Sequence, residues 1–254
     1  MKYIYLIALC IVLSSCATGG RGDREGGRDG GDATIETTVG DLPECASVTG
    51  NVQCKNVDAT RIFTVPEAYP PSGFAAYGII AFGSRAMPAD IDRHLMICEA
   101  YSAALAHAFE SDVQQSEQLV TVWPVTRYEV SVKLNYAPRA EVCQPAVRYY
   151  DLLTAQKAYR DAELAGAKLS GIGPYLLAWS PSDQKGQMDA LVLVADLSTV
   201  TTPLQAQNVF NNWRNDIEMD PLLWKNGWDL DRVRLKIQQW ADLYGERMVT
   251  MLIQ

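Results

Sequence analysis

Four apolar runs of strand length are separated by stretches with helical periodicity, and this alternation limits the chain to a small set of folds. Continuous apolar runs bounded by glycine or proline are typical of buried strands. The four runs are Phe74–Phe82, Leu119–Trp123, Tyr175–Trp179 and Ala190–Ala195. The segment from Tyr128 to Leu134 alternates apolar and polar residues, which indicates a further, optional strand with one exposed face.

Other segments show the spacing of amphipathic helices, in which apolar residues recur at every third and fourth position. The first spans about residues 88–110, with Pro88 in its first turn, where proline is tolerated. The second begins at Pro145 and runs to about Ala165, and the third runs from Pro203 to about Glu218. Asp229 can cap the last helix, whose apolar stripe continues to Met251.

The order of these elements is strand, helix, strand, helix, strand, strand, helix, helix, which predicts an α/β fold. Helical crossovers make the first three strands parallel. About ten residues separate the third and fourth strands, too few for a crossover, so an antiparallel hairpin is favoured. We therefore expect a small mixed, mainly parallel sheet flanked by helices, with a C-terminal helical hairpin.

The N-terminus has the pattern of a signal peptide. Lys2 precedes an apolar run from Ile4 to Leu13, and this run is shorter than the roughly 20 residues of a membrane-spanning helix. Leu13-Ser14-Ser15-Cys16 follows and resembles the lipobox of bacterial lipoproteins. The resemblance implies cleavage before Cys16 and anchoring in a membrane by fatty acyl chains on that cysteine, several of which give stable attachment.

The residue after the cysteine bears on which membrane holds the protein. In bacterial lipoproteins an aspartate there favours retention in the inner membrane, whereas this chain has Ala17. The resemblance therefore implies the outer membrane, on either its periplasmic or its surface face. The alternative is an ordinary secretory signal that leaves Cys16 as a free thiol.

Composition divides the rest of the chain into two parts. Residues 17–44 are rich in glycine and in charges of both signs, and such a segment cannot bury enough apolar surface to fold. We interpret residues 1–15 as the signal peptide, 16–44 as the lipidated cysteine and a flexible tether, and 45–254 as a single α/β domain. The net charge of −8, without a basic stripe, argues against nucleic acid as a partner.

Four cysteines follow Cys16, and an even number in an exported protein favours disulfides. Cys45 and Cys54 lie close together in a polar segment, so they are expected to pair. Cys98 and Cys143 would then pair across the core, the alternative being two buried free thiols.

Few residues suggest catalysis or metal binding. His94 and His107, both on the helix expected over residues 88–110, would lie roughly 20 Å apart and could not share a metal ion. His94 and Cys98 face each other across one helical turn, but Cys98 lies on the apolar stripe, which favours a disulfide or core role. Asp196-Leu197-Ser198 resembles the start of the metal loop of von Willebrand type A domains, but Val200 replaces its last serine, and helix capping is the better interpretation. We expect no metal and no cofactor.

A candidate ligand site follows from the predicted topology. Ligands of open α/β sheets gather at the carboxyl ends of parallel strands. That edge would collect Ser84, Arg85, Trp123 and Ser180. Asp196 would end an antiparallel strand at the opposite edge, so Ser180 and Asp196 could not form a dyad. Arg85 could hold an anion, the alternative being a solvated loop arginine.

Four tryptophans gather in the last quarter of the chain. Trp213 and Trp240 have helical spacing and are expected in the core, whereas Trp224 and Trp228 could equally form a binding surface.

These observations favour a non-catalytic envelope lipoprotein that is held to the membrane by its lipid and binds an envelope protein or polysaccharide. The alternative is a hydrolase of cell-wall or surface glycan, which would need two carboxylates about 5–10 Å apart across a cleft. A third hypothesis is a small-anion binder that uses Arg85.

Overall fold

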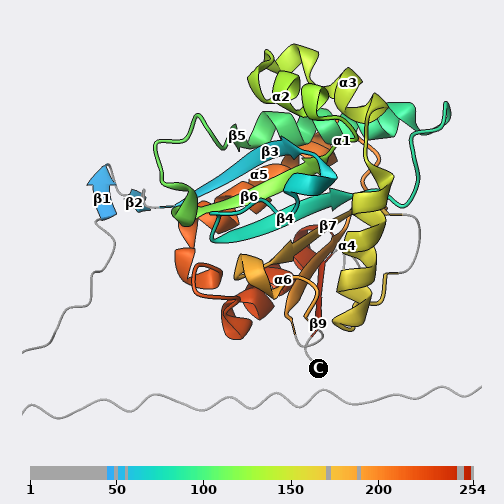
Figure 1. Ribbon diagram of the computed structural model, residues 1–254. Helices are drawn as coiled ribbons and strands as arrows, with labels where there is room; N and C mark the ends of the chain where they lie inside the picture. The colour runs from blue at the N-terminus through green and yellow to red at the C-terminus, as the bar shows by residue number, and fades with distance from the viewer. Residues whose placement is uncertain are drawn as a thin grey trace, which may run out of the picture. The chain divides into compact units, whose positions relative to one another are not determined.

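A computed structural model describes residues 45–48, 51–54, 57–169, 173–187, 190–244 and 249–252 (Figure 1). The predicted signal peptide, the lipobox cysteine Cys16 and the predicted tether up to residue 44 lie outside these residues. Strands β1 (Cys45–Val48) and β2 (Asn51–Cys54) pair antiparallel, with Cys45 opposite Cys54. The disulfide between Cys45 and Cys54 stays a prediction, and the pairing of these two residues across the strands is compatible with it.

A seven-stranded sheet is the centre of the described domain, with the strand order β5-β3-β6-β4-β7-β8-β9. Neighbouring strands are parallel from β5 to β4 and antiparallel from β4 to β9, so only β7 and β9 run against the others within the described sheet. The mixed, mainly parallel α/β sheet is thus confirmed. The strands are β3 (Asp58–Thr64), β4 (Ala76–Ala81), β5 (Ala106–His107), β6 (Gln118–Pro124), β7 (Tyr175–Trp179), β8 (Val192–Asp196) and β9 (Val249–Leu252).

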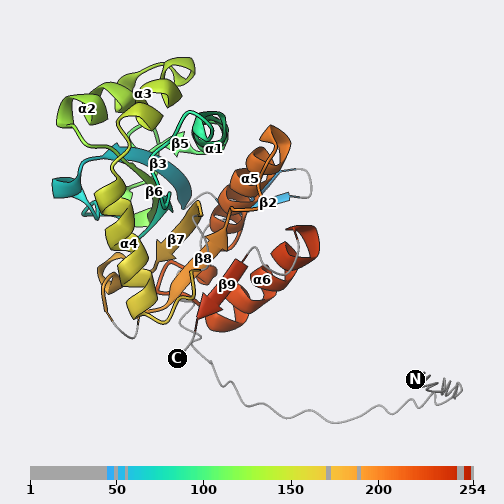
Figure 2. The ribbon, with the colours of Figure 1, turned by 90° about the vertical axis from the view of Figure 1, so that its right-hand side faces the viewer.

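Helices cover both faces of this sheet (Figure 2). They are α1 (Ile91–Ala104), α2 (Tyr128–Tyr136), α3 (Cys143–Arg148), α4 (Leu152–Leu164), α5 (Pro203–Met219) and α6 (Leu230–Tyr244). Short 3-10 helices lie at Pro66–Ala68, Gln115–Glu117, Arg139–Glu141, Ser182–Gln184 and Pro221–Leu223. Figure 2 shows α4 on one side of the sheet and α1, α5 and α6 on the other. None of the described helices is both long enough and apolar enough to span a membrane.

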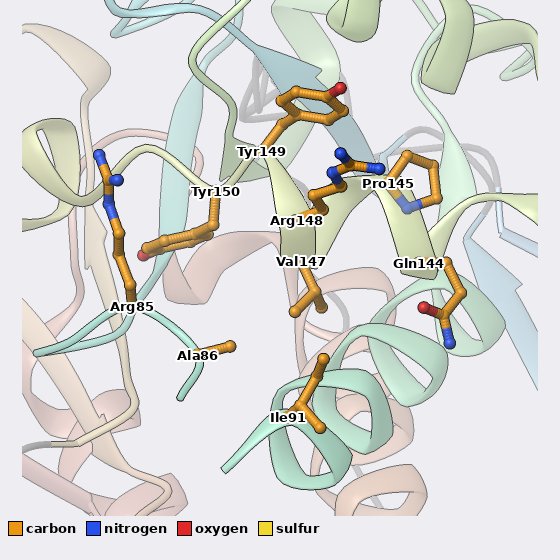
Figure 3. Close-up of a pocket in the computed structure, with 9 residues that line it drawn as sticks. All are labelled: Arg85, Ala86, Ile91, Gln144, Pro145, Val147, Arg148, Tyr149 and Tyr150. Atoms are coloured by element: carbon orange, nitrogen blue, oxygen red, sulfur yellow. The ribbon is translucent and has the colours of Figure 1, made fainter. Parts of the chain in front are cut away.

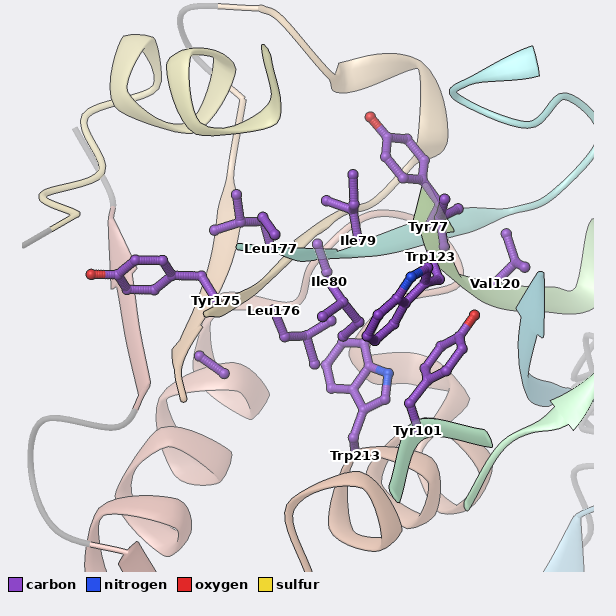
Figure 4. Packing of buried hydrophobic residues seen from close by; sticks show 14 of the residues in the cluster. Tyr77, Ile79, Ile80, Tyr101, Val120, Trp123, Tyr175, Leu176, Leu177 and Trp213 are labelled. Carbon is purple, nitrogen blue, oxygen red and sulfur yellow. The ribbon is translucent and has the colours of Figure 1, made fainter. Parts of the chain in front are cut away.

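Hydrogen bonds from aromatic side chains fix the helices on the sheet. On one face, Tyr101 of α1 donates to the carbonyl of Thr121, and the indole of Trp213 on α5 donates to the hydroxyl of the same threonine. On the other face, Tyr159 of α4 donates to the carbonyl of Ala81. Buried polar atoms in folded proteins are usually paired in this way. The rings of Tyr101 and Trp213 join one continuous core with strand residues such as Ile80 (Figure 4).

Two expectations about strands are wrong. The strand β7 was expected to be parallel to β4, but the two are antiparallel, with Tyr175 opposite Ala81. The optional strand at Tyr128–Leu134 is the helix α2, in which Ser131 and Leu134 turn inward at helical spacing. The apolar residues of that segment fit the period of a strand as well as that of a helix. Its contacts with the rest of the domain decide for the helix. The predicted antiparallel hairpin of β7 and β8 is confirmed.

The helices also differ from the expectation in extent. The predicted helix over residues 88–110 ends at Ala104, so His107 lies in β5 and not on the helix of His94. The helix predicted from Pro145 to Ala165 is divided into α3 and α4. The helix predicted over residues 203–218 and the cap at Asp229, whose carboxylate accepts from the Arg232 amide, are confirmed. Met251, expected in the last helix, lies in β9.

Candidate anion-binding pocket

After two neighbouring parallel strands the chain reaches helices on opposite faces of the sheet, although α2 and α3 come between β6 and α4 and α3 packs against α1. β4 is followed by α1, which lies on the face that carries α5, whereas the segment after β6 leads to α4 on the other face. Such a switch in direction opens a crevice at the carboxyl ends of the two strands, where α/β proteins commonly bind ligands.

A cavity of about 530 Å³ lies in this place, within the size range of ligand pockets. We call it the Arg85 pocket. One wall comes from the segment after β4, and the other from α3 and the two tyrosines that follow it (Figure 3). Its lining residues are Arg85, Ala86, Ile91, Gln144, Pro145, Val147, Arg148, Tyr149 and Tyr150.

Positive charge dominates the Arg85 pocket. Arg85 and Arg148 are the charged residues of the lining, and both are solvent-exposed. Arg148 and Arg127 each place a guanidinium over the ring of Tyr149, at 5.5 and 5.0 Å from its centroid. Among the ion pairs of the described residues, none involves these three arginines. Their positive charges are therefore not balanced by an ion-paired carboxylate among the described residues.

Buried contacts hold the α3 wall of the pocket in place. The hydroxyl of Tyr150 donates to the carbonyl of Ile80 and accepts from the amide of Phe82, at 2.8 and 2.9 Å. The indole of Trp123 donates to the carbonyl of Ala146 in α3. These bonds connect the wall to the ends of β4 and β6.

A disulfide fixes the beginning of α3. The structure contains the expected bridge between Cys98 of α1 and Cys143 of α3, with Cα atoms 5.5 Å apart. Both cysteines are buried, and the hydroxyl of Ser102 lies against their sulfur atoms. The alternatives of free thiols and of a Cys98–His94 nucleophilic pair are thereby excluded for this oxidised form.

A second cavity of about 610 Å³ adjoins the first, and Gln144 lines both. We call it the Gln207 cavity. It has a mixed polar lining made by α1, α3, α5 and the turn before α3. Its lining residues are Leu95, Glu99, Ser102, Ala103, Arg139, Ala140, Cys143, Gln144 and Gln207.

His94 lies near Ser84 and Asp90 but does not form a catalytic triad with them. Its Nδ1 donates to the backbone carbonyl of Asp90 at 3.0 Å, not to the carboxylate, and its ring stacks on Phe82. Nε2 is buried and has no hydrogen-bond partner among the described residues. Burial lowers the pKa of His94, which favours the neutral imidazole. The adjacent cavity of about 20 Å³ is large enough for a water molecule only.

His107 has a structural role. Its Nε2 donates to Asn135 and its Nδ1 accepts from the amide of Phe109, so both ring nitrogens are satisfied in the neutral form. Burial lowers the pKa of this histidine as well. Within the described residues, no group of three or more His, Cys, Asp or Glu side chains is placed to hold a metal ion.

The residues predicted for the ligand edge do not all meet. Arg85 lines the Arg85 pocket, and Ser84 lines the small cavity beside His94. Trp123 is fully buried behind α3 and serves the core. The prediction for Ser180 is wrong because β7 runs antiparallel to β4, which places Ser180 at the opposite edge, where its hydroxyl donates to the carbonyl of Trp224.

The same reversal moves Asp196 to the edge where it was not expected. Because β8 is antiparallel to β7, it ends at the carboxyl edge of the parallel strands. Asp196 pairs with Tyr175 in register, far from Ser180, so the two form no dyad. Its carboxylate accepts from the Ser198 amide and caps a turn, whereas Thr202 caps α5. Trp213, Trp224 and Trp228 are all buried in the core.

Four important residues of the site were not predicted, namely Arg127, Gln144, Arg148 and Tyr149. The last three fell inside a single helix expected from Pro145 or immediately before it. The available signal was the sequence Arg148-Tyr149-Tyr150-Asp151, in which Asp151 caps α4 and so ends the preceding helix. No family model, curated protein or solved structure matches this chain.

Proposed function

We propose that this chain is a lipid-anchored, non-catalytic protein of the bacterial outer membrane, and that its α/β domain binds an anionic group of an envelope protein or polysaccharide in the Arg85 pocket. The anchor is the acylated Cys16 implied by the lipobox-like sequence Leu13-Ser14-Ser15-Cys16. The Cys98–Cys143 bridge supports the proposed export, because disulfides persist in oxidising compartments.

The observation that carries the binding proposal is the gathering of arginines that form no ion pair among the described residues, in a protein with a net charge of −8. Arg85 and Arg148 line a cavity at the switch point of the sheet, and its lining includes no carboxylate. Guanidinium groups bind carboxylates and phosphates through paired hydrogen bonds, so an anion is the complementary ligand.

The hydrolase alternative gains no comparable support. It needs two facing carboxylates. Among the three cavities of the described residues considered above, the Arg85 pocket contributes none, the Gln207 cavity contributes Glu99, and the cavity beside His94 contributes Asp90. The small-anion hypothesis uses the same pocket, and partner capture separates it from the main proposal.

Cross-linked affinity purification of the full-length protein from detergent-solubilised envelopes tests the binding role. We expect the wild type to capture a reproducible partner, and the double variant Arg85→Glu/Arg148→Glu to lose it. Arg234→Glu is the matched control, because Arg234 lies on α6, is 62% exposed and pairs only with the exposed Asp231 among the described residues. Equal capture by the wild type and the double variant would refute the role of the pocket.

The anchor has a separate test. Cys16→Ala should abolish incorporation of a fatty-acid label and release the protein from membranes. If the wild type takes up no label, and the variant still sediments with membranes, the anchor proposal is wrong.

A further inference from the structure

We infer that the ligand is an acidic polysaccharide that lies across both the Arg85 pocket and the Gln207 cavity, with its negative charge held by Arg85 and Arg148. This inference rests on the proposed function and narrows it, because it selects a polysaccharide over a protein partner.

The first support is the position of the two cavities. Gln144 lines both, so a ligand too long for the Arg85 pocket can continue past this side chain into the Gln207 cavity. Each cavity alone has the volume of a small-molecule site. Two such volumes that meet at one exposed residue suit an extended chain better than a single small anion.

The second support is the difference in chemistry between the two cavities. The Arg85 pocket contributes guanidinium groups and no carboxylate. The Gln207 cavity combines two amides with Glu99 and Arg139, so it offers donors and acceptors together. Sugar hydroxyls both donate and accept, and this mixed lining can satisfy them in either role.

The polar groups of the Gln207 cavity are also available. Glu99, Arg139, Gln144 and Gln207 are exposed, and none of their side chains has a hydrogen-bond or ion-pair partner within the described residues. Leu95 is the large apolar side chain of the lining. The centre of a protein–protein interface is richer in apolar and aromatic residues than this. The lining therefore favours a polyhydroxylated chain over a peptide.

Calorimetric titration of the full-length detergent-solubilised protein with oligogalacturonates, from the monomer to the hexamer, tests the inference. We expect the dissociation constant to fall by about tenfold or more from dimer to hexamer, because a longer chain gains hydrogen bonds in the Gln207 cavity. Neutral oligosaccharides of equal length should bind much more weakly. Rising salt concentration should weaken the binding of the acidic oligosaccharide, because exposed charges are screened.

Two variants separate the cavity from the rest of the surface. Gln207→Trp should fill the Gln207 cavity and bring the ratio of hexamer to dimer affinity close to one, and Arg139→Ala should lower the same ratio. Gln114→Trp is the matched control, because Gln114 is exposed and precedes β6, at the opposite edge of the sheet. The Gln114→Trp variant should keep the wild-type ratio of hexamer to dimer affinity.

Other outcomes overturn the inference in different ways. Affinity that does not depend on chain length, yet is lost in Arg85→Glu/Arg148→Glu, would refute the extended site and leave the anion pocket intact. Equal binding of polyglutamate peptides would show that charge alone is recognised and would favour a protein partner. Absence of oligogalacturonate binding together with unchanged partner capture by the double variant would refute this inference and the proposed function alike.

Discussion

Removal of the Cys98–Cys143 bridge by the double substitution Cys98→Ala/Cys143→Ala is expected to destabilise the domain strongly. The two cysteines are 45 positions apart in sequence. Closing a loop of this length lowers the conformational entropy of the unfolded chain, which corresponds to about 4 kcal/mol of stability at room temperature. Because typical domains unfold with about 5–15 kcal/mol, this loss is a large part of the total.

Urea unfolding followed by tryptophan fluorescence measures this loss, since Trp123, Trp179 and Trp224 are fully buried and report on the core. With a urea dependence of about 2 kcal/mol per molar, the midpoint should fall by about 2 M. The wild type with reductant should approach the variant. Ser102→Ala is the control, because it removes a side chain that touches the sulfur atoms and keeps the bridge.

The variant should also lose ligand binding, because α3 carries Arg148 and Gln144 and begins at Cys143. An unchanged urea midpoint in Cys98→Ala/Cys143→Ala would refute the reasoning about loop closure. Equal urea midpoints for the oxidised and the reduced wild type would refute the presence of the bridge in solution.

Three further predictions concern buried polar groups. Tyr150→Phe removes two main-chain hydrogen bonds and should lower the free energy of unfolding by about 2 kcal/mol, whereas the exposed Tyr128→Phe should change little in the same urea assay. Trp213→Phe leaves the Thr121 hydroxyl without its indole donor and should cost about 1–3 kcal/mol, with fluorescence or circular dichroism as the measure. Burial lowers the folded-state pKa of His94 and His107, so the unfolded chain binds more protons than the folded chain as the pH falls. The contribution of the two neutral histidines to the free energy of unfolding should therefore be complete above about pH 6.5 and decline below it. Replacing both histidines by glutamine should make unfolding less sensitive to acid, and an identical pH profile would contradict this.

The apolar runs predicted four strands of the sheet because β4, β6 and β7 are buried on both faces and β8 is mostly buried, and a continuous apolar run is the direct consequence. β3 was missed because it reads Asp-Ala-Thr-Arg-Ile-Phe-Thr and contains an arginine. Two of its polar side chains bond to residues distant in sequence: Thr60 donates to Gln118, and the Nε of Arg61 donates to the carbonyl of Leu105. A strand of this kind is recognisable only once its neighbours are in place.

The direction of β7 could not be derived from the sequence either. A single helix between β6 and β7 would act as a crossover and make the strands parallel. The chain instead forms α2, α3 and α4 in this interval, and Asp151 separates the last two by capping α4. The error carried over to the site, since the direction of β7 decides the edge on which Ser180 lies. The prediction for Arg85 was not affected, because Arg85 follows β4, and β4 precedes the interval between β6 and β7 that was predicted incorrectly.

The α3 wall links the pocket to the compartment in which the protein is proposed to work. A helix of six residues has little stability of its own, because nucleation is unfavourable and few bonds follow it. The position of α3 thus depends on the bridge at Cys143 and on the Trp123 indole bonded to Ala146. In a reducing compartment the bridge would be lost, and α3, which carries Gln144 and Arg148, would lose one of the two contacts that hold it. The proposed export therefore supplies the oxidising conditions that the binding site requires, which makes reductant sensitivity of binding a property of the site itself.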